Sequence, residues 1–128
     1  MLDTEFDEFG NDKAQQEYFL GMTCRTAQEY DQALPHFQRS LELMPHYKTC
    51  QRVAEMLHAL GRTSEAEPYI VQAYELNPNH SQAATEYAKL LSERGLKEDA
   101  KSLLIQVLGH NITYSPAKNL LNLLENDT

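Results

Sequence analysis

A pattern of small, bulky and proline residues recurs every 33 to 34 residues along this 128-residue chain. Its copies, each an alanine followed by a bulky apolar residue and, in the first two, a proline, are Ala33, Phe37 and Pro45; Ala66, Ile70 and Pro78; and Ala100 and Leu104. A fixed period of this length is typical of a helix pair that stacks on further copies of itself. The period therefore predicts an array of helix pairs, an architecture that presents an extended surface to a partner.

Each unit is expected to contain two helices, because apolar residues recur at spacings of three and four in both halves of the unit. The expected helices start at Ala14 and cover 31–44 in the first unit, 47–60 and 65–76 in the second, and 81–94 and 97–108 in the third. Proline cannot continue a helix, so Pro45 and Pro78 mark unit ends. A generic helical bundle would share the helical spacing but not the fixed recurrence.

The pattern resembles the tetratricopeptide repeat (TPR) family, in which Leu-Gly and an aromatic residue of one helix are followed by Ala, an aromatic residue and Pro of the next. The residues that carry the resemblance are Leu20, Gly21, Ala33, Phe37 and Pro45; Val53, Ala54, Leu57, Ala66, Ile70 and Pro78; and Tyr87, Ala88, Leu91, Ala100 and Leu104. The chain departs from the family at Glu17, Cys50 and Ala84, where tryptophan is usual. Ile112 stands in place of the third proline. The resemblance implies an all-α, right-handed superhelical solenoid of helix-turn-helix repeats.

The same pattern divides the chain into three parts. Residues 1–13 are predicted to form an acidic, flexible arm, residues 14–114 three repeats (about 14–46, 47–80 and 81–114), and residues 115–128 a capping helix and tail. In the last part Ser115 is a favoured N-cap and Pro116 suits the first helical position. The apolar face that should cover the third repeat consists of Ala117, Leu120, Leu121 and Leu124. Leu123 lies off this stripe, as either a lone exposed leucine or a contact between chains.

Net charge argues against two classes of partner. The chain carries a formal charge of −8, and it has no basic stripe that could neutralise a nucleic-acid backbone. An acidic chain is equally unsuited to an anionic membrane surface. No apolar run reaches the length of a membrane span, and no signal peptide or lipidation motif is recognised. We therefore expect no nucleic-acid partner, no membrane insertion and a cytoplasmic location.

No residue set with catalytic or metal-binding spacing is recognised. The glycines do not form a phosphate-binding loop, and the five histidines are scattered. His46 and His80 are expected to be solvated in the turns between repeats. Cys24 and Cys50 are predicted to be small buried core residues, and the alternative is a disulfide bond between them. The sequence thus predicts no catalytic residue, no metal, no cofactor and no enzymatic activity.

In a solenoid of this kind the first helix of each repeat lines the concave face. The peptide-binding residues predicted on that face are Tyr18, Phe19, Met22, Arg25, Lys48, Arg52, Glu55, His58, Thr85 and Lys89. The aromatic and thioether groups of the first repeat suit an apolar side chain. Lys48 and Arg52 stand one helical turn apart and suit a carboxylate. The alternative is that these polar side chains merely form a solvated face.

Some TPR proteins bind the free carboxylate of a chaperone tail with a set of Lys, Asn and Arg residues. The resemblance implies which positions of this chain correspond to that set. Tyr18 and Met22 stand at the first-repeat places, Arg52 replaces Asn, and Gln82 and Glu86 replace Lys and Arg. The set is not reproduced here. The sequence instead favours a ligand segment that mixes apolar and charged residues and is internal or extended.

The amino-terminal arm interleaves Leu2, Phe6 and Phe9 with acidic residues. Its composition is too acidic for independent folding. Two interpretations stay open: a solubilising tail, or a docking segment that orders in its own groove or in that of a neighbouring chain.

These observations predict a protein–protein interaction module, a small adaptor or scaffold that binds a peptide segment of a partner in its concave groove. The first alternative is a self-assembling, homo-oligomeric TPR scaffold. The second is a three-repeat chaperone of the kind found in type III secretion.

Overall fold

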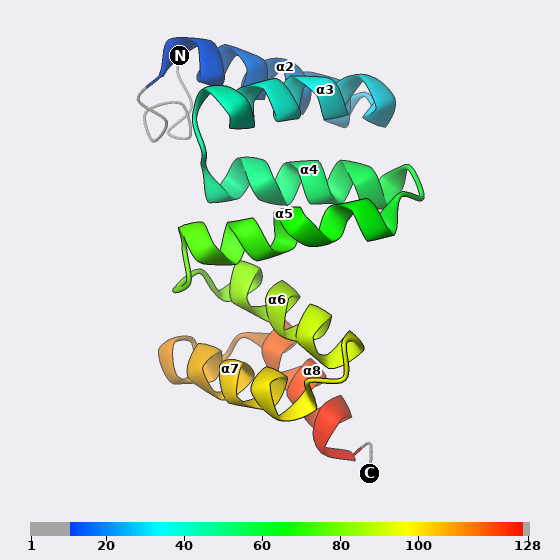
Figure 1. Ribbon diagram of the computed structural model, residues 1–128. Helices are drawn as coiled ribbons and strands as arrows, with labels where there is room; N and C mark the ends of the chain where they lie inside the picture. Colours follow the sequence, from blue (N-terminus) through cyan, green and yellow to red (C-terminus); the bar gives the residue numbers. More distant parts are fainter. Residues whose placement is uncertain (1–10, 127–128) are drawn as a thin grey trace. The chain divides into compact units, whose positions relative to one another are not determined.

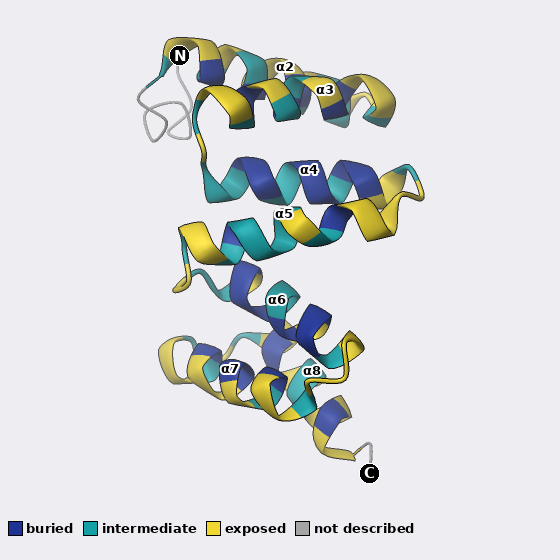
Figure 2. Cartoon of the chain, viewed as in Figure 1, coloured by how far each residue is buried: buried dark blue, intermediate teal, exposed yellow. Residues whose placement is uncertain are grey.

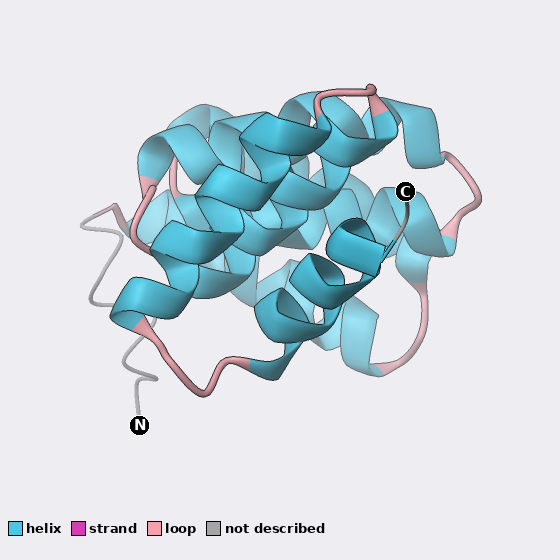
Figure 3. Cartoon of the chain, turned by 90° about the horizontal axis from the view of Figure 1, so that it is seen from below, coloured by secondary structure: helices cyan, strands magenta, loops and turns pink. Residues whose placement is uncertain are grey.

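All regular structure in the part of the chain that the computed structural model describes, residues 11–126, is α-helical (Figures 1 and 3). The helices follow one another through short loops, as the repeat pattern predicted, and the prediction of an all-α helical-repeat fold is confirmed. The chain divides into two compact units, residues 1–76 and 77–128. The arm residues proposed to dock, Leu2, Phe6 and Phe9, lie outside the described residues.

Unit 1 contains two helix pairs. Its helices are α2 (Asp12–Thr26), α3 (Tyr30–Leu43), α4 (Tyr47–Ala59) and α5 (Thr63–Leu76). Helix α2 packs against α3, α4 packs against α5, and α3 contacts α4, so the second pair stacks on the first. Helix α2 begins two residues earlier than the predicted arm boundary. The reason is Asn11, whose Oδ1 atom accepts a hydrogen bond from the Ala14 N–H at 3.0 Å and caps the helix.

Unit 2 contains one helix pair and a third helix. These are α6 (Ser81–Glu93), α7 (Lys97–His110) and α8 (Ser115–Asn126). Helix α8 contacts both α6 and α7, and it buries Ala117 and Leu124. The Lys118 N–H donates to the Tyr114 carbonyl oxygen at 3.2 Å, so Ser115 is the first helical residue rather than the predicted N-cap.

The turn after each first helix has the same backbone form. Gln28, Gly61 and Gly95 all have positive φ angles, of 62°, 74° and 84°. In each turn the N–H of the next residue donates back to a carbonyl oxygen of the last helical turn, at 2.8 to 2.9 Å. This left-handed residue closes a helix by satisfying carbonyl groups that would otherwise lack a donor. Glycine accepts the conformation without strain, whereas Gln28 adopts it despite its Cβ atom.

The core of unit 1 is one cluster of buried residues contributed by all four helices, which Figure 2 colours dark blue. Phe37 of α3 is completely buried, and its ring meets the Tyr18 ring of α2 edge-on, with centroids 5.5 Å apart. Gly21 lies beneath the same ring. A Cβ atom added at Gly21 would stand 2.6 Å from Cε1 of Phe37, which is closer than carbon atoms approach. The pair therefore packs closely only because residue 21 has no side chain.

The change Gly21→Ala is expected to destabilise the protein by roughly 1–3 kcal/mol, because the Phe37 ring must move out of its packed position. Urea unfolding followed by circular dichroism measures this. Gly109→Ala is the matched control, since a Cβ atom at this α7 glycine meets nothing within 4 Å. It should be neutral or stabilising by up to about 1 kcal/mol. Equal losses in the two variants would contradict the packing at Gly21.

The histidines before α4 and α6 are helix caps, which corrects the expectation that they are merely solvated. Nδ1 of His46 accepts from the Lys48 N–H at 3.1 Å. Nδ1 of His80 accepts from the Ala83 N–H at 3.3 Å. Each imidazole thus satisfies one of the N–H groups that an α-helix leaves without a partner in its first turn.

Replacing His46 by Ala should lower the free energy of unfolding by about 1 kcal/mol, the usual cost of losing an N-cap acceptor. His46 also stacks on Tyr47, with centroids 5.0 Å apart. His46→Asn loses the stacking but keeps a capping oxygen, so it is the control that isolates the cap. If the Asn and Ala variants unfold at the same urea concentration, the cap does not contribute to stability.

Candidate functional site

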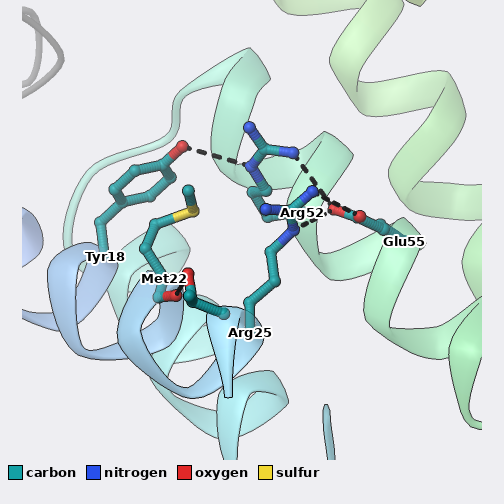
Figure 4. Close-up of polar contacts among 6 residues, drawn as sticks. Tyr18, Met22, Arg25, Arg52 and Glu55 are labelled. Atoms are coloured by element: carbon teal, nitrogen blue, oxygen red, sulfur yellow. Dashed lines mark hydrogen bonds and ion pairs between the residues drawn. The ribbon is translucent and has the colours of Figure 1, made fainter. Parts of the chain in front are cut away.

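A polar network joins the two first helices of unit 1 (Figure 4). The Arg25 side chain of α2 reaches Glu55 of α4 through two parallel hydrogen bonds, Nε to Oε1 at 2.9 Å and Nη2 to Oε2 at 2.8 Å. Arg52 of α4 donates from Nη1 to the same Oε1 atom at 3.1 Å. Its Nε atom donates to the Tyr18 hydroxyl oxygen at 3.4 Å. We call Tyr18, Arg25, Arg52 and Glu55 the Arg–Glu network.

The network contains two guanidinium groups and one carboxylate, so it carries one excess positive charge. Burial by itself would raise the pKa of Glu55, but the hydrogen bonds and charges of Arg25 and Arg52 outweigh it and lower that pKa. Burial would likewise lower the pKa of Arg52, but the contacts with Tyr18 and Glu55 raise it. Glu55 and Arg52 are therefore both charged at neutral pH.

The network keeps unused donors. Nη1 of Arg25 and Nη2 of Arg52 have no acceptor within the described part of the chain. The three charged side chains retain between 29% and 41% of their exposure. An anionic group from outside can thus reach two guanidinium groups whose positions are already set by Glu55, which is the arrangement that favours charge-assisted hydrogen bonds.

The position of Tyr18 differs from the prediction. It was expected to be free of packing and open to a ligand, but its side chain is only 4% exposed and belongs to the core. The ring packs against Phe37 because Gly21 leaves room for that ring one helical turn away. Only the Tyr18 hydroxyl takes part in the polar face. The neighbouring Phe19 is 55% exposed and is the more exposed of the two aromatic residues of this helix.

The other predicted residues are dispersed. Met22 is half-buried and packs against the core of unit 1. Lys48 and His58 stand near opposite ends of α4, and Nδ1 of His58 lies 3.3 Å from the Thr63 hydroxyl oxygen. In unit 2, Lys89 is exposed.

Thr85, also in unit 2, is buried rather than open to a ligand. Its hydroxyl oxygen has no hydrogen-bond partner among the described residues. The small neighbours of Thr85, Ala84 and Ala88, allow close helix packing around it, so its place on the predicted face was misjudged.

Two glutamates, Glu55 and Glu17, make contacts between helices that were not recognised in the sequence. The Arg25–Glu55 pair joins residues 30 positions apart, close to one repeat period, and the periodic register could have indicated it. The second involves Glu17, at the place where tryptophan is usual. Its carboxylate lies 2.7 Å from Nε of Arg39 and 2.9 Å from Nδ1 of His36, and it ties α2 to α3.

The described residues contain no group of three or more His, Cys, Asp and Glu side chains that could hold a metal ion. Cys24 and Cys50 are free thiols rather than a disulfide. Burial raises the pKa of Cys50 to about 12, so this thiol is protonated at neutral pH. No helix in residues 11–126 is long and apolar enough to cross a membrane.

Comparison with known families agrees with this geometry. Two profiles described as tetratricopeptide repeat match the chain, one over residues 57–124, more than half of its length, and one over residues 18–48. The chain belongs to the tetratricopeptide repeat family. No curated protein matches it.

Three solved structures with this fold are similar to the chain. One is YrrB, described as a TPR protein with an unusual peptide-binding site, at 22% identity and a TM-score of 0.72; the match covers 87% of this chain and 58% of that chain. The first TPR of Spaghetti (RPAP3), bound to the HSP90 peptide SRMEEVD, has 20% identity and a TM-score of 0.71, with coverages of 88% and 93%. The second TPR domain of human RPAP3, in complex with the HSP70 peptide SGPTIEEVD, has 17% identity and a TM-score of 0.70, with coverages of 89% and 99%.

Acid is expected to destabilise the protein partly through Glu55. Because the pKa of Glu55 is lowered in the folded state, its contribution to stability is complete above the ordinary value of 4.5 and is lost as the pH falls through the lower folded-state value. Glu55→Gln should be less stable than the wild type at pH 7 and should lose less stability between pH 5 and pH 3. Urea midpoints across this range measure the effect.

Glu125→Gln is the control for this comparison, since Glu125 is exposed near the end of α8. It should follow the wild type at every pH. A Glu55→Gln variant whose acid profile also follows the wild type would mean that the network does not hold the carboxylate in its charged form.

Proposed function

We propose that the chain is a protein–peptide interaction module, a small adaptor or scaffold whose first helices bind a segment of a partner protein. The observation that carries this proposal is the Arg–Glu network, in which two guanidinium groups share one carboxylate. The network carries a net positive charge, whereas the chain as a whole has a net charge of −8. Its guanidinium groups are partly exposed, and cations already held in position attract a carboxylate.

The residue types at the site indicate which kind of ligand segment it would bind. Phe19 is 55% exposed and lies on α2, six residues before Arg25. A ligand segment with an acidic residue next to a bulky apolar residue would pair with both features. Support by analogy comes from the first TPR of Spaghetti (RPAP3) and the second TPR domain of human RPAP3, which were solved with peptides that contain glutamates next to a valine.

A displayed library of random 12-residue peptides, selected on the full chain, tests the proposal. Selection should enrich sequences that place Asp or Glu near an apolar residue. A synthetic copy of the best sequence should bind Arg52→Ala about tenfold or more weakly than the wild type, because a partly buried arginine anchor is lost. Fluorescence anisotropy measures the affinities.

Arg62→Ala is the matched control. Arg62 also pairs with a glutamate, Glu65 at 2.7 Å, but on the exposed start of α5. Its loss should leave the affinity unchanged. The proposal fails if no sequence is enriched, or if the two arginine variants bind the selected peptide alike.

A further inference from the structure

A cleft lies between the two second helices of unit 1, apart from the Arg–Glu network on α2 and α4. It has a volume of about 390 Å³, and its lining residues are Gln38, Leu41 and Glu42 of α3 and Tyr69 and Gln72 of α5. Ligand pockets in proteins usually measure about 300–1,000 Å³, so this cleft has room for a long side chain. Both helices belong to the same compact unit, which places all the lining residues within one body.

The lining combines fixed apolar groups with polar groups that keep their hydrogen-bonding capacity. Leu41 and Tyr69 are half-buried and pack against the core of unit 1, so the fold sets their positions. Glu42 is exposed, and its carboxylate makes no ion pair or hydrogen bond with any described residue. The side chains of Gln38 and Gln72 likewise have no such partner within residues 11–126. Three polar side chains of the cleft are thus available to a ligand.

Among the described residues that line it, the cleft contains one carboxylate and no cation. The nearest arginines along the chain are held by other carboxylates. Arg39 of α3 pairs with Glu17 at 2.7 Å. Arg62, just before α5, interacts with Tyr69 but donates two hydrogen bonds of 2.7 Å to Glu65. The negative charge of the cleft is therefore not neutralised from within the described part of the chain.

Charge is unevenly divided between the first and second helices of unit 1. Helices α3 and α5 together hold five Asp and Glu residues and one arginine, which gives them a formal charge of −4. Helices α2 and α4 together hold four Lys and Arg residues and three Asp and Glu residues, which gives +1. Because complementary potentials favour association, a cationic group is attracted to the second helices and an anionic group to the first.

Arginine is the side chain whose chemistry matches this lining. Its guanidinium group has five N–H donors and no acceptor, which suits the carboxylate of Glu42 and the amide oxygens of Gln38 and Gln72. Its planar face stacks on aromatic rings such as that of Tyr69. Its aliphatic stem can lie along apolar surface such as that of Leu41. An acidic side chain would meet the carboxylate, and an aliphatic one would leave the polar groups without partners.

We propose that the cleft between α3 and α5 is a second binding site, which takes an arginine side chain from a partner segment. The occupant differs from the acidic segment assigned to the Arg–Glu network. The inference does not rest on that network, since no lining residue of the cleft belongs to it. A chain with both sites would bring together two segments of opposite charge.

A short peptide titrated into the full, ¹⁵N-labelled chain tests this proposal. The probe is acetyl-Gly-Arg-Gly-amide. One control peptide carries citrulline, which has the shape of arginine without its charge, and another carries lysine. The arginine peptide should shift the side-chain amide signals of Gln38 and Gln72, with a dissociation constant on the order of 1 mM for a single side chain. The citrulline and lysine peptides should bind several-fold more weakly.

Two protein variants locate the contact. Glu42→Gln should weaken binding of the arginine peptide about tenfold, because a charge-assisted hydrogen bond is lost. Glu75→Gln is the matched control and should bind like the wild type. Glu75 is the exposed glutamate of α5 that stands 33 residues after Glu42, but it does not line the cleft. Added salt should weaken binding to the wild type more than binding to Glu42→Gln.

Three results would overturn the proposal. Equal binding of the citrulline peptide would mean that the charge is not recognised. Equal binding of the lysine peptide would mean that the lining does not select a guanidinium group. An equal effect of Glu42→Gln and Glu75→Gln would mean that the peptide responds only to the general acidity of α3 and α5. Amide spectra of both variants verify that folding is retained.

Discussion

The close approach of the two helices within each repeat is the constraint on which the rest of the structure depends. In the first repeat it requires a residue without a side chain at Gly21, because the ring of Phe37 occupies the space above it. Alanine at positions 54 and 88 holds the same place in the later repeats. A pair that packs this tightly commits one face of each helix to the core, and the remaining face of each first helix is left for other contacts.

The register of the repeat separates constant positions from variable ones. The small residues that let the helices approach recur from repeat to repeat. The position that follows them changes its chemistry from one first helix to the next, and it is Met22, Glu55, Lys89 and Leu123 in turn. Packing forces fix the first set, since a larger side chain would separate the helices. In the second set Met22 packs against the core of unit 1, but Glu55, Lys89 and Leu123 retain exposed surface, so packing constrains their chemistry less.

The ion pair between Arg25 and Glu55 in unit 1 forms because the second helix pair stacks on the first. Arg25 and Glu55 are far apart in sequence and become neighbours because α4 stands one repeat beyond α2. The carboxylate holds both guanidinium groups in place, and burial of the Tyr18 ring fixes the hydroxyl that Arg52 meets. A surface ion pair contributes little to stability by itself. The ion pair instead fixes the positions of two partly exposed guanidinium groups, each of which keeps an N–H group without an acceptor among the described residues.

The repeat period, the helical spacing and the turn residues determined the fold from sequence alone, and the helix bounds agree to within about two residues. These signals are local or periodic, so one chain is enough to recognise them. The tertiary structure alone decided which side chains remain accessible: it buries Tyr18 and Thr85, caps helices with His46 and His80, and pairs Arg25 with Glu55. The two caps are local contacts that depend on the backbone geometry at the start of each helix. The burial of Tyr18 and Thr85 and the Arg25–Glu55 pair depend on elements remote in sequence, and a pattern along one helix carries no information about what another helix places against it.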